Sequence, residues 1–279
     1  MSLNYNYIRK DGIIKNIIRI IKFNIRKFYY KNNYERLNKI CFNNSNNIVN
    51  FFQNNNLLAI DLLHIQYGCR NFNFNQGYIS FERDLSIINE YYPNIFKTRM
   101  IPVINLNEDY IIYLKNTPNM INEGLFFLSL HYKNQPIYNL NFITLNDGIL
   151  ITCLQGCGSG NNIKEYIKNF TKCFFGLRPI TFMIFYSFIF IKKLKLKYVY
   201  GVDDFYAISS FKRGKKRKGK ILNIHNLDEI FKENCEVIEQ FQGYKKLSFK
   251  TTPINEIPSN KRSMYKKRYM FLDNLILNN

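Results

Sequence analysis

The residues best suited to chemistry lie in one glycine-rich hexapeptide, QGCGSG, at residues 155–160. An apolar run precedes it and an amphipathic segment follows it, so the sequence predicts a buried strand, a tight turn and a helix. Glycines allow backbone N–H groups to converge, and a helix N-terminus adds positive potential behind them. We therefore expect Gln155, Gly156, Gly158 and Gly160 to bind an anion such as a phosphate. A glycine turn that only reverses the chain is the alternative.

Two carboxylates and an arginine are the other candidates. Asp203 and Asp204 directly follow a predicted strand, Tyr198–Val202. Carboxylates beside a phosphate-binding loop can take a proton from an amine or a hydroxyl group, so both are candidate catalytic residues. An Asx turn at the end of the strand is the alternative. Arg178 precedes Pro179 between two predicted helices, where its guanidinium is suited to a phosphate or to a buried carboxylate.

Other nucleophiles and metal ligands form no motif. Cys157 has no His or Asp near it in the sequence that would activate its thiol. Cys153 and Cys157 lack a second pair of ligands at zinc-finger spacing, so no metal site is predicted. Ordinary surface or core positions are expected for the three histidines, His64, His131 and His225.

The composition indicates a globular protein that is attracted to polyanions. Among 279 residues, 46% are hydrophobic, which is enough for a sizeable core. Forty Lys and Arg residues against 20 Asp and Glu residues give a net charge of +20. This charge favours an anionic membrane surface, an anionic substrate or, less so, nucleic acid as partner. Six scattered cysteines are typical of a reducing compartment.

Targeting signals are not evident in the sequence. The N-terminal residues lack the pattern of a secretory signal peptide. The best apolar run, residues 180–191, is well short of the roughly 20 residues that a membrane-spanning helix needs. We expect a cytoplasmic protein, either soluble or peripheral on the inner membrane.

Residues 1–95 are expected to form a mainly helical N-terminal region. Between Ile13 and Tyr30, apolar residues recur at three- and four-residue spacing with cations on the other side, which predicts an amphipathic basic helix. Such a helix is suited to an anionic membrane surface or a partner's groove. A docked surface helix with a solvated polar face is the alternative. Further helical patterns lie at 48–52, 57–64 and 84–91.

Residues 96–279 are expected to form an α+β domain. Strands are predicted at 104–106, 110–114, 125–132, 137–145, 148–154, 198–202 and 244–249, the middle ones as an antiparallel meander. Helices are predicted at 163–174, 180–194 and 227–241, with a final basic helix after Pro258. The cationic run 212–220 is expected to be a loop. The fold class is therefore α+β, with a mixed, mainly antiparallel central sheet flanked by helices.

The hexapeptide carries a resemblance to a known superfamily. Gln155, Gly158 and Gly160 satisfy the pattern Q-x-x-G-x-G, which resembles the pyrophosphate-loop signature of the GNAT acyltransferases. In that superfamily the loop follows the last strand of a meander and precedes a helix. The resemblance implies a GNAT-like core with coenzyme A or acyl-CoA as cofactor. The loop amides would hold the pyrophosphate, and Arg178 is a further candidate for a phosphate.

A second resemblance covers residues 154–269. The landmarks are Leu154-Gln155-Gly156, Gly176-Leu177-Arg178-Pro179, Gly201-Val202, the run EIPSNKRSMY at 256–265 and Arg268-Tyr269. Their order and spacing resemble the bacterial VirK/YbjX family. The resemblance implies a role in virulence, resistance to antimicrobial peptides and outer-membrane maintenance. The chain departs from the family pattern because it has no histidine shortly after Gly201-Val202 and no tryptophan.

Three functions remain open from the sequence. The favoured one is a VirK-like envelope-maintenance protein that acts as an acyl-CoA-dependent acyltransferase. The first alternative is a non-enzymatic peripheral membrane or adaptor protein. Nucleic-acid binding ranks last, because the cations do not form a recognisable reading motif.

Overall fold

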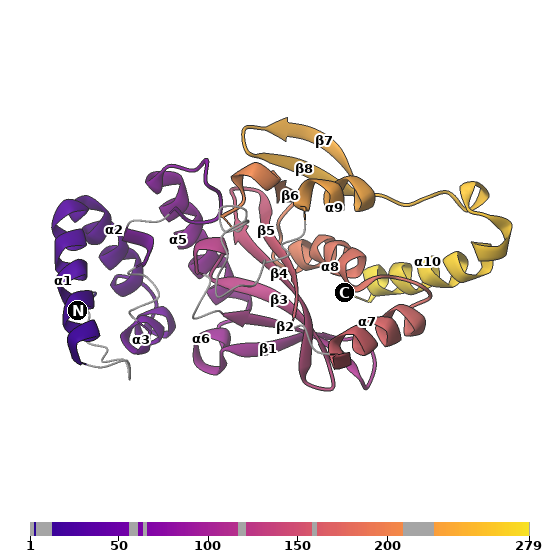
Figure 1. Ribbon diagram of the computed structural model, residues 1–279, viewed down its shortest axis with the longest axis horizontal. Helices are drawn as coiled ribbons and strands as arrows, with labels where there is room; N and C mark the ends of the chain where they lie inside the picture. The colour runs from indigo at the N-terminus through magenta and orange to yellow at the C-terminus, as the bar shows by residue number, and fades with distance from the viewer. Residues whose placement is uncertain are drawn as a thin grey trace.

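The computed structural model describes Leu3 and residues 13–55, 61–63, 66–116, 121–157, 161–208 and 226–278 (Figure 1). The described α-helices are α1 (Ile13–Tyr29), α2 (Lys31–Phe42), α3 (Asn46–Asn54), α5 (Phe74–Tyr91), α6 (Ile95–Thr98), α7 (Asn161–Cys173), α8 (Pro179–Lys193), α9 (Leu227–Asn234) and α10 (Arg262–Leu277). The described strands are β1 (Met100–Asn105), β2 (Tyr110–Asn116), β3 (Phe126–Tyr132), β4 (Gln135–Thr144), β5 (Gly148–Gly156), β6 (Tyr198–Val202), β7 (Cys235–Phe241) and β8 (Tyr244–Phe249).

The strands form one eight-stranded sheet in the order β1-β2-β3-β4-β5-β6-β8-β7. Neighbouring strands pair antiparallel except β5 and β6, which pair parallel. A parallel connection needs a crossover, and α7 and α8 supply it. The α+β class and the mixed, mainly antiparallel sheet are confirmed.

One face of the sheet is apolar and is covered by α8. Leu114, Leu128, Leu140 and Leu154 lie opposite one another across β2, β3, β4 and β5, and all are buried. Burying one such side chain contributes about 1.5–3 kcal/mol, so this row stabilises the sheet. The sequence of α8 is apolar on all sides, as is typical of a helix with no solvent-facing side.

The N-terminal helices join the sheet through a buried carboxylate. Asp84 of α5 accepts a hydrogen bond from the backbone N–H of Thr144 at 2.5 Å and another from the hydroxyl of Tyr67. Tyr67 in turn accepts one from the backbone N–H of Leu125 at 2.8 Å. The buried apolar residues form one cluster on both sides of residue 95, so the helical part and the sheet share a core.

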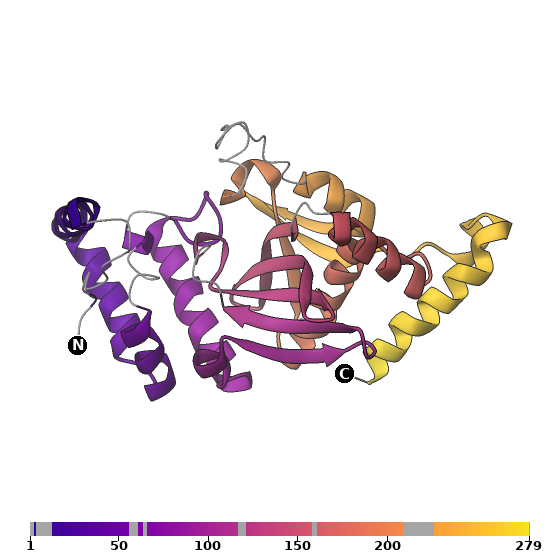
Figure 2. The same cartoon turned by 60° about the horizontal axis from the view of Figure 1, so that its bottom comes forward.

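Helix α10 lies at the other end of the molecule from α1, α2 and α3 (Figures 1 and 2). Its Phe271 packs on Phe174, the residue after α7, with ring centroids 5.0 Å apart, and on Phe182 of α8 at 6.1 Å. The C-terminal helix therefore closes the core over the crossover helices.

The predicted helix at 227–241 is wrong. Helix α9 ends at Asn234, and residues from Cys235 onward form β7, which pairs antiparallel with β8. The connecting turn contains Gly243 at φ +95°, a conformation that favours glycine. Val237 and Ile238 are β-branched, and the hydrogen bonds to β8 decide in favour of a strand. The start of α9 is as predicted, because Asn226 accepts hydrogen bonds from the N–H groups of Asp228 and Glu229.

Candidate functional site at the carboxyl end of β5

Strand β5 continues past the end of its parallel partner. Residues Gly148–Ile151 pair with Tyr198–Gly201 of β6, whereas β5 runs on to Gly156. Across β4, Asn141 lies opposite Cys153 and Phe142 lies opposite Ile151, so Thr152 is an extra residue that forms a bulge. Bulges bend a strand and increase its twist. Among the residues that the structure describes, the last part of β5 thus has β4 as its ladder partner and none on the β6 side.

The predicted anion-binding residues lie where β5 ends. Gln155 is exposed, and Gly156 lies opposite Tyr138. A Cβ atom on Gly156 would meet the Tyr138 ring at 3.9 Å, which is an ordinary contact, so packing does not require glycine there. The N–H of Cys157 donates to the carbonyl of Ile137 at 3.0 Å. Gly158 and Gly160 lie outside the described residues, and α7 begins at Asn161.

The surroundings of Cys157 favour its protonated thiol. Burial is the main cause that raises its pKa to about 11, and the nearby Lys115 opposes this shift. A thiol with such a pKa is protonated at pH 7, whereas reactive cysteines have a lowered pKa.

The face of the sheet opposite the leucines carries a polar row. Tyr113, Ser129, Asn139 and Gln155 lie opposite one another across β2, β3, β4 and β5. Ser129 is fully buried, Tyr113 and Asn139 are partly buried, and Gln155 is exposed. The row therefore runs from the interior of the sheet to solvent at the end of β5.

His131 extends this row with hydrogen bonds at both ring nitrogens. Its Nδ1 lies 3.1 Å from the carbonyl oxygen of Asn134 and its Nε2 lies 3.0 Å from Oγ of Ser129. A carbonyl oxygen only accepts, so we assign the proton to Nδ1, which leaves Nε2 as an acceptor that faces Oγ of Ser129. The Ser129 hydroxyl donates to Oδ1 of Asn139 at 2.7 Å, so this oxygen and Nε2 of His131 compete for its single proton.

The surroundings of His131 keep the imidazole neutral. Its pKa is lowered to about 4, mainly by burial and also by Lys115, whereas the bond to Asn134 opposes the shift. A neutral imidazole bonded to a serine hydroxyl is a base beside a nucleophile. Neither Ser129 nor His131 is among the site residues predicted from the sequence. The available signal was their spacing of two residues in an otherwise apolar strand, which places both on one face.

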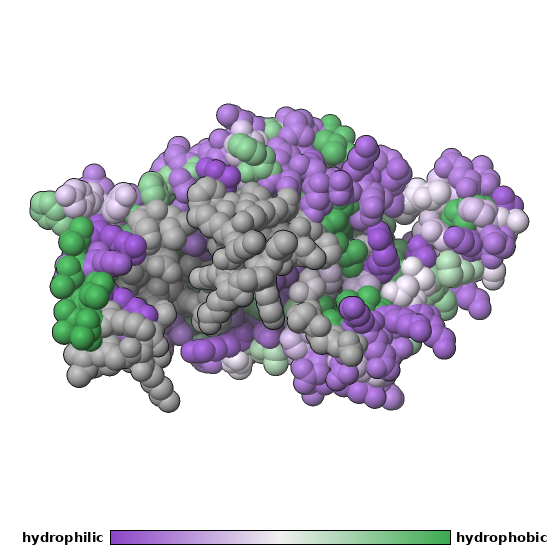
Figure 3. Space-filling view, in the orientation of Figure 1, coloured by the Kyte–Doolittle hydropathy of each residue, from purple (hydrophilic) through white to green (hydrophobic). Residues whose placement is uncertain are grey.

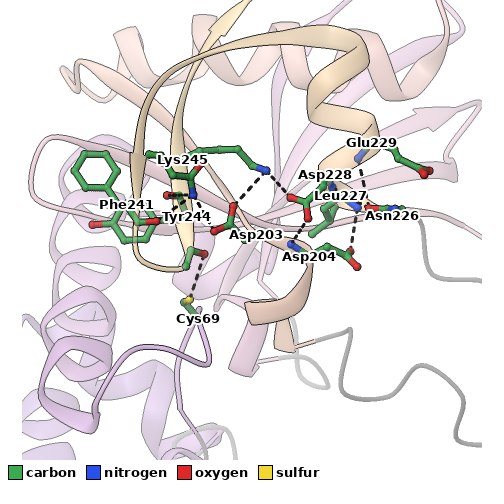
Figure 4. A network of polar contacts seen from close by, with 12 residues as sticks. Cys69, Asp203, Asp204, Asn226, Leu227, Asp228, Glu229, Phe241, Tyr244 and Lys245 are labelled. Carbon is green, nitrogen blue, oxygen red and sulfur yellow. Dashed lines mark hydrogen bonds and ion pairs between the residues drawn. The ribbon is translucent and has the colours of Figure 1, made fainter.

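Asp203 and Asp204 lie in an ion-paired network (Figure 4). Oδ1 of Asp203 lies 3.2 Å from Nζ of Lys245, and Oδ2 accepts a hydrogen bond from Gln240 at 3.0 Å. Lys245 also pairs with Asp228. Asp204 accepts from the N–H of Leu227 at 3.1 Å. These contacts connect the end of β6 to α9 and β8, and a catalytic role for either aspartate stays a prediction.

Arg178 pairs with a carboxylate at the surface. Its Nη2 lies 2.7 Å from Oε2 of Glu233, and both side chains are well exposed. Arg178 lies close enough to Tyr138 to oppose the rise in the pKa of that hydroxyl, which burial causes. Because Tyr138 lies opposite Gly156, the positive charge of Arg178 acts near the end of β5.

The landmarks around 176 and 264–269 contact each other. Nε and Nη2 of Arg268 donate to the carbonyl of Phe175 at 3.1 and 3.0 Å. A Cβ atom on Gly176, at φ +75°, would lie 3.0 Å from Sδ of Met264. The hydroxyl of Tyr269 donates to the carbonyl of Thr252 at 2.8 Å. These residues hold α10 against the bend between α7 and α8.

The comparison with protein families decides the identity of the chain. The profile of a family described as "Protein of unknown function (DUF535)" matches residues 12–278. The chain belongs to the DUF535 family. This is the VirK/YbjX family that the landmarks indicate.

Curated relatives of this DUF535 protein carry no assigned activity. One uncharacterised protein of Haemophilus influenzae is 31% identical over 173 residues, which cover 60% of this chain and 55% of the relative. A second from the same organism is 32% identical over 160 residues, covering 56% and 52%. The chain thus spans about half the length of these relatives. No solved structure matches the chain significantly.

Across the part that the structure describes, no helix combines the length and the apolar character needed to cross a bilayer. The same residues contain no group of three or more His, Cys, Asp or Glu side chains placed to hold a metal ion.

Proposed function

We propose that this DUF535 protein is an acyl-CoA-dependent N- or O-acyltransferase in envelope maintenance, with its site at the carboxyl end of β5. The observation that carries the proposal is the run of β5 past its parallel partner β6, toward the segment before α7. A strand without a ladder partner on one side offers backbone donors and acceptors to a ligand that contains amides. The pantetheine arm of coenzyme A contains two amide groups.

Cations on α7, the helix that follows this strand in the chain, support the assignment of a phosphorylated cofactor. Lys164, Lys168 and Lys172 recur every four residues and so follow one side of α7. Lys168 and Lys172 line an open groove of about 1130 Å³ between α7 and α10, together with Lys267. In the proposal, amides of the segment 156–160 hold the pyrophosphate and these lysines face the remaining phosphate. The amide of Cys157 is not among the donors, because it already bonds Ile137.

The transfer itself needs an acceptor and a base. The acceptor nitrogen or oxygen attacks the thioester carbonyl, the C–S bond breaks, and the thiolate of coenzyme A leaves. The acceptor's proton passes to the base and then to the thiolate. Asp203 is a candidate base. Before it can contact the acceptor, its carboxylate must give up its ion pair with Lys245 or its hydrogen bond from Gln240. His131, whose pKa of about 4 leaves it neutral at pH 7, is a second candidate at the inner end of the polar row.

Calorimetry with coenzyme A tests the proposal. Gly156→Trp should abolish binding, because the indole would fill the space beside the end of β5. Gly156→Ala is the matched control, since its Cβ meets nothing closer than the Tyr138 ring at 3.9 Å. Wild type and Gly156→Ala should bind with similar affinity. Absence of binding to the wild type at millimolar coenzyme A contradicts the enzyme hypothesis.

Peripheral membrane association is the second candidate function, and the exposed apolar residues of α1 favour it. It requires no cofactor and is compatible with an acyltransferase. Binding to anionic vesicles without binding of coenzyme A would support a non-enzymatic protein. Retention on DNA that falls steeply with salt would instead support the third hypothesis, nucleic-acid binding.

A further inference from the structure

Helix α1 turns its apolar side to solvent. Figure 3 shows this side as a continuous hydrophobic stripe at one end of the molecule. Phe28 is 81% exposed and Ile14 is 75% exposed. The other members of the stripe are at least 44% exposed and are Ile17, Ile18, Ile21 and Ile25. Contiguous apolar patches of this kind mark interaction sites, whereas single exposed apolar residues do not.

The opposite side of α1 makes the contact with the protein. Asn16 and Phe23 are buried, and the ring of Phe23 packs edge-on against Tyr34 of α2 with centroids 6.4 Å apart. Nζ of Lys27 lies 4.3 Å from the centroid of the same Tyr34 ring. A surface helix normally buries its apolar face, and α1 does the reverse. The docked-helix alternative from the sequence therefore does not describe α1.

A row of cations borders the stripe. Arg19, Lys22 and Arg26 are spaced by three and four residues, so they follow one side of the helix next to the isoleucines. The helix contains no acidic residue. At 17 residues and about 1.5 Å per residue, α1 is roughly 25 Å long, enough to lie along a surface.

We propose that α1 binds the surface of an anionic lipid bilayer, with its axis in the plane of the interface. The isoleucines and Phe28 enter the boundary between headgroups and acyl chains, and the cations face the anionic headgroups. A second copy of the chain is a poorer occupant, because facing stripes would bring the two rows of cations together at a net charge of +20 each. The bilayer supplies both the apolar and the anionic partner.

Sedimentation of the full chain with vesicles tests this proposal. Vesicles of equal parts phosphatidylglycerol and phosphatidylcholine should bind the protein at least tenfold more tightly than pure phosphatidylcholine. The double variant Ile21→Asp, Ile25→Asp should lose this binding. Its residues are 52% and 50% exposed, so the fold should tolerate the change. Ile238→Asp on β7, at 61% exposure, is the matched control and should bind like the wild type.

Charge variants and oligomeric state complete the test. Lys22→Gln should weaken binding about five-fold, and added salt should reduce the effect. Equal binding to both kinds of vesicle, or undiminished binding of the double variant, overturns the proposal. The proposal is also overturned if the wild type does not bind vesicles but forms a concentration-dependent dimer, and the double variant is monomeric. That result would assign the stripe to contact with a second copy of the chain. Thermal unfolding of each variant checks that it is folded.

Discussion

The imidazole of His131 is a buried group whose charge follows from its surroundings. Its folded-state pKa of about 4 lies below the value near 6.5 of an unfolded chain. Between about pH 6.5 and pH 4 the unfolded chain therefore binds more protons than the folded one. The free energy of unfolding should fall as pH decreases through this window. At higher pH, titration of His131 should not change that free energy.

An NMR titration measures this directly. The His131 ring signals, identified by their absence in His131→Gln, should titrate with a midpoint near pH 4. The same variant should lose part of the acid-induced decrease in stability. A midpoint near the ordinary value of about 6.5 would contradict the buried, hydrogen-bonded imidazole.

Some residues of the candidate site were not predictable from the sequence. Alternation within one strand places Ser129 and His131 on a common face, but it does not reveal that Asn139 lies opposite Ser129. That pairing depends on the register between β3 and β4. The partners of Asp203 depend in the same way on β8, which supplies Lys245. Residue types were sufficient to select candidate site residues. They were insufficient to identify the partners of these residues on neighbouring strands.

At the scale of elements, the Tyr67–Asp84 pair joins the N-terminal helices to the sheet. Burial raises the pKa of Asp84 to about 7, and the hydrogen bonds from Thr144 and Tyr67 oppose this rise. The folded chain therefore binds more protons than the unfolded chain between about pH 4 and pH 7. The contribution of this carboxyl to stability decreases as pH rises through that window, opposite in sign to that of His131.

Removal of the Tyr67 hydroxyl tests this link between the N-terminal helices and the sheet. Tyr67→Phe keeps the ring that packs on Phe81 at 5.3 Å, yet leaves the N–H of Leu125 and the carboxyl of Asp84 without that partner. The free energy of unfolding should fall by about 1–3 kcal/mol in urea denaturation. Tyr198→Phe, at an exposed ring, is the control and should change it by less than about 0.5 kcal/mol. Equal effects of the two variants would contradict the role of the pair.

Local sequence patterns are sufficient to predict the bounds of some helices and strands. Strand β6 has the predicted bounds, and α1 and α8 begin and end within one residue of the predicted ones, because their periodicity is strong. The prediction of helix for residues 235–241 is wrong, because only the pairing with β8 distinguishes this segment from the end of a helix. The periodicity of α1 was predicted correctly. The side of α1 that packs on α2 is the one that contacts Tyr34, and the sequence of α1 alone does not reveal this contact.

At the scale of the whole molecule, two basic surfaces lie at opposite ends. Helix α1 is at one end, and the groove between α7 and α10 is at the other (Figure 1). A protein that lies on a bilayer through α1 would leave this groove open to a phosphorylated ligand. The two proposals are therefore independent, and failure of either leaves the other standing.

The central claim is that the last residues of β5 bind coenzyme A, and amide hydrogen exchange with and without the cofactor tests it most directly. The predicted result is slower exchange in residues 152–157 and in the first turn of α7, with α1 unchanged. Unchanged exchange at the end of β5 under saturating coenzyme A, or protection confined to other elements, would contradict the account.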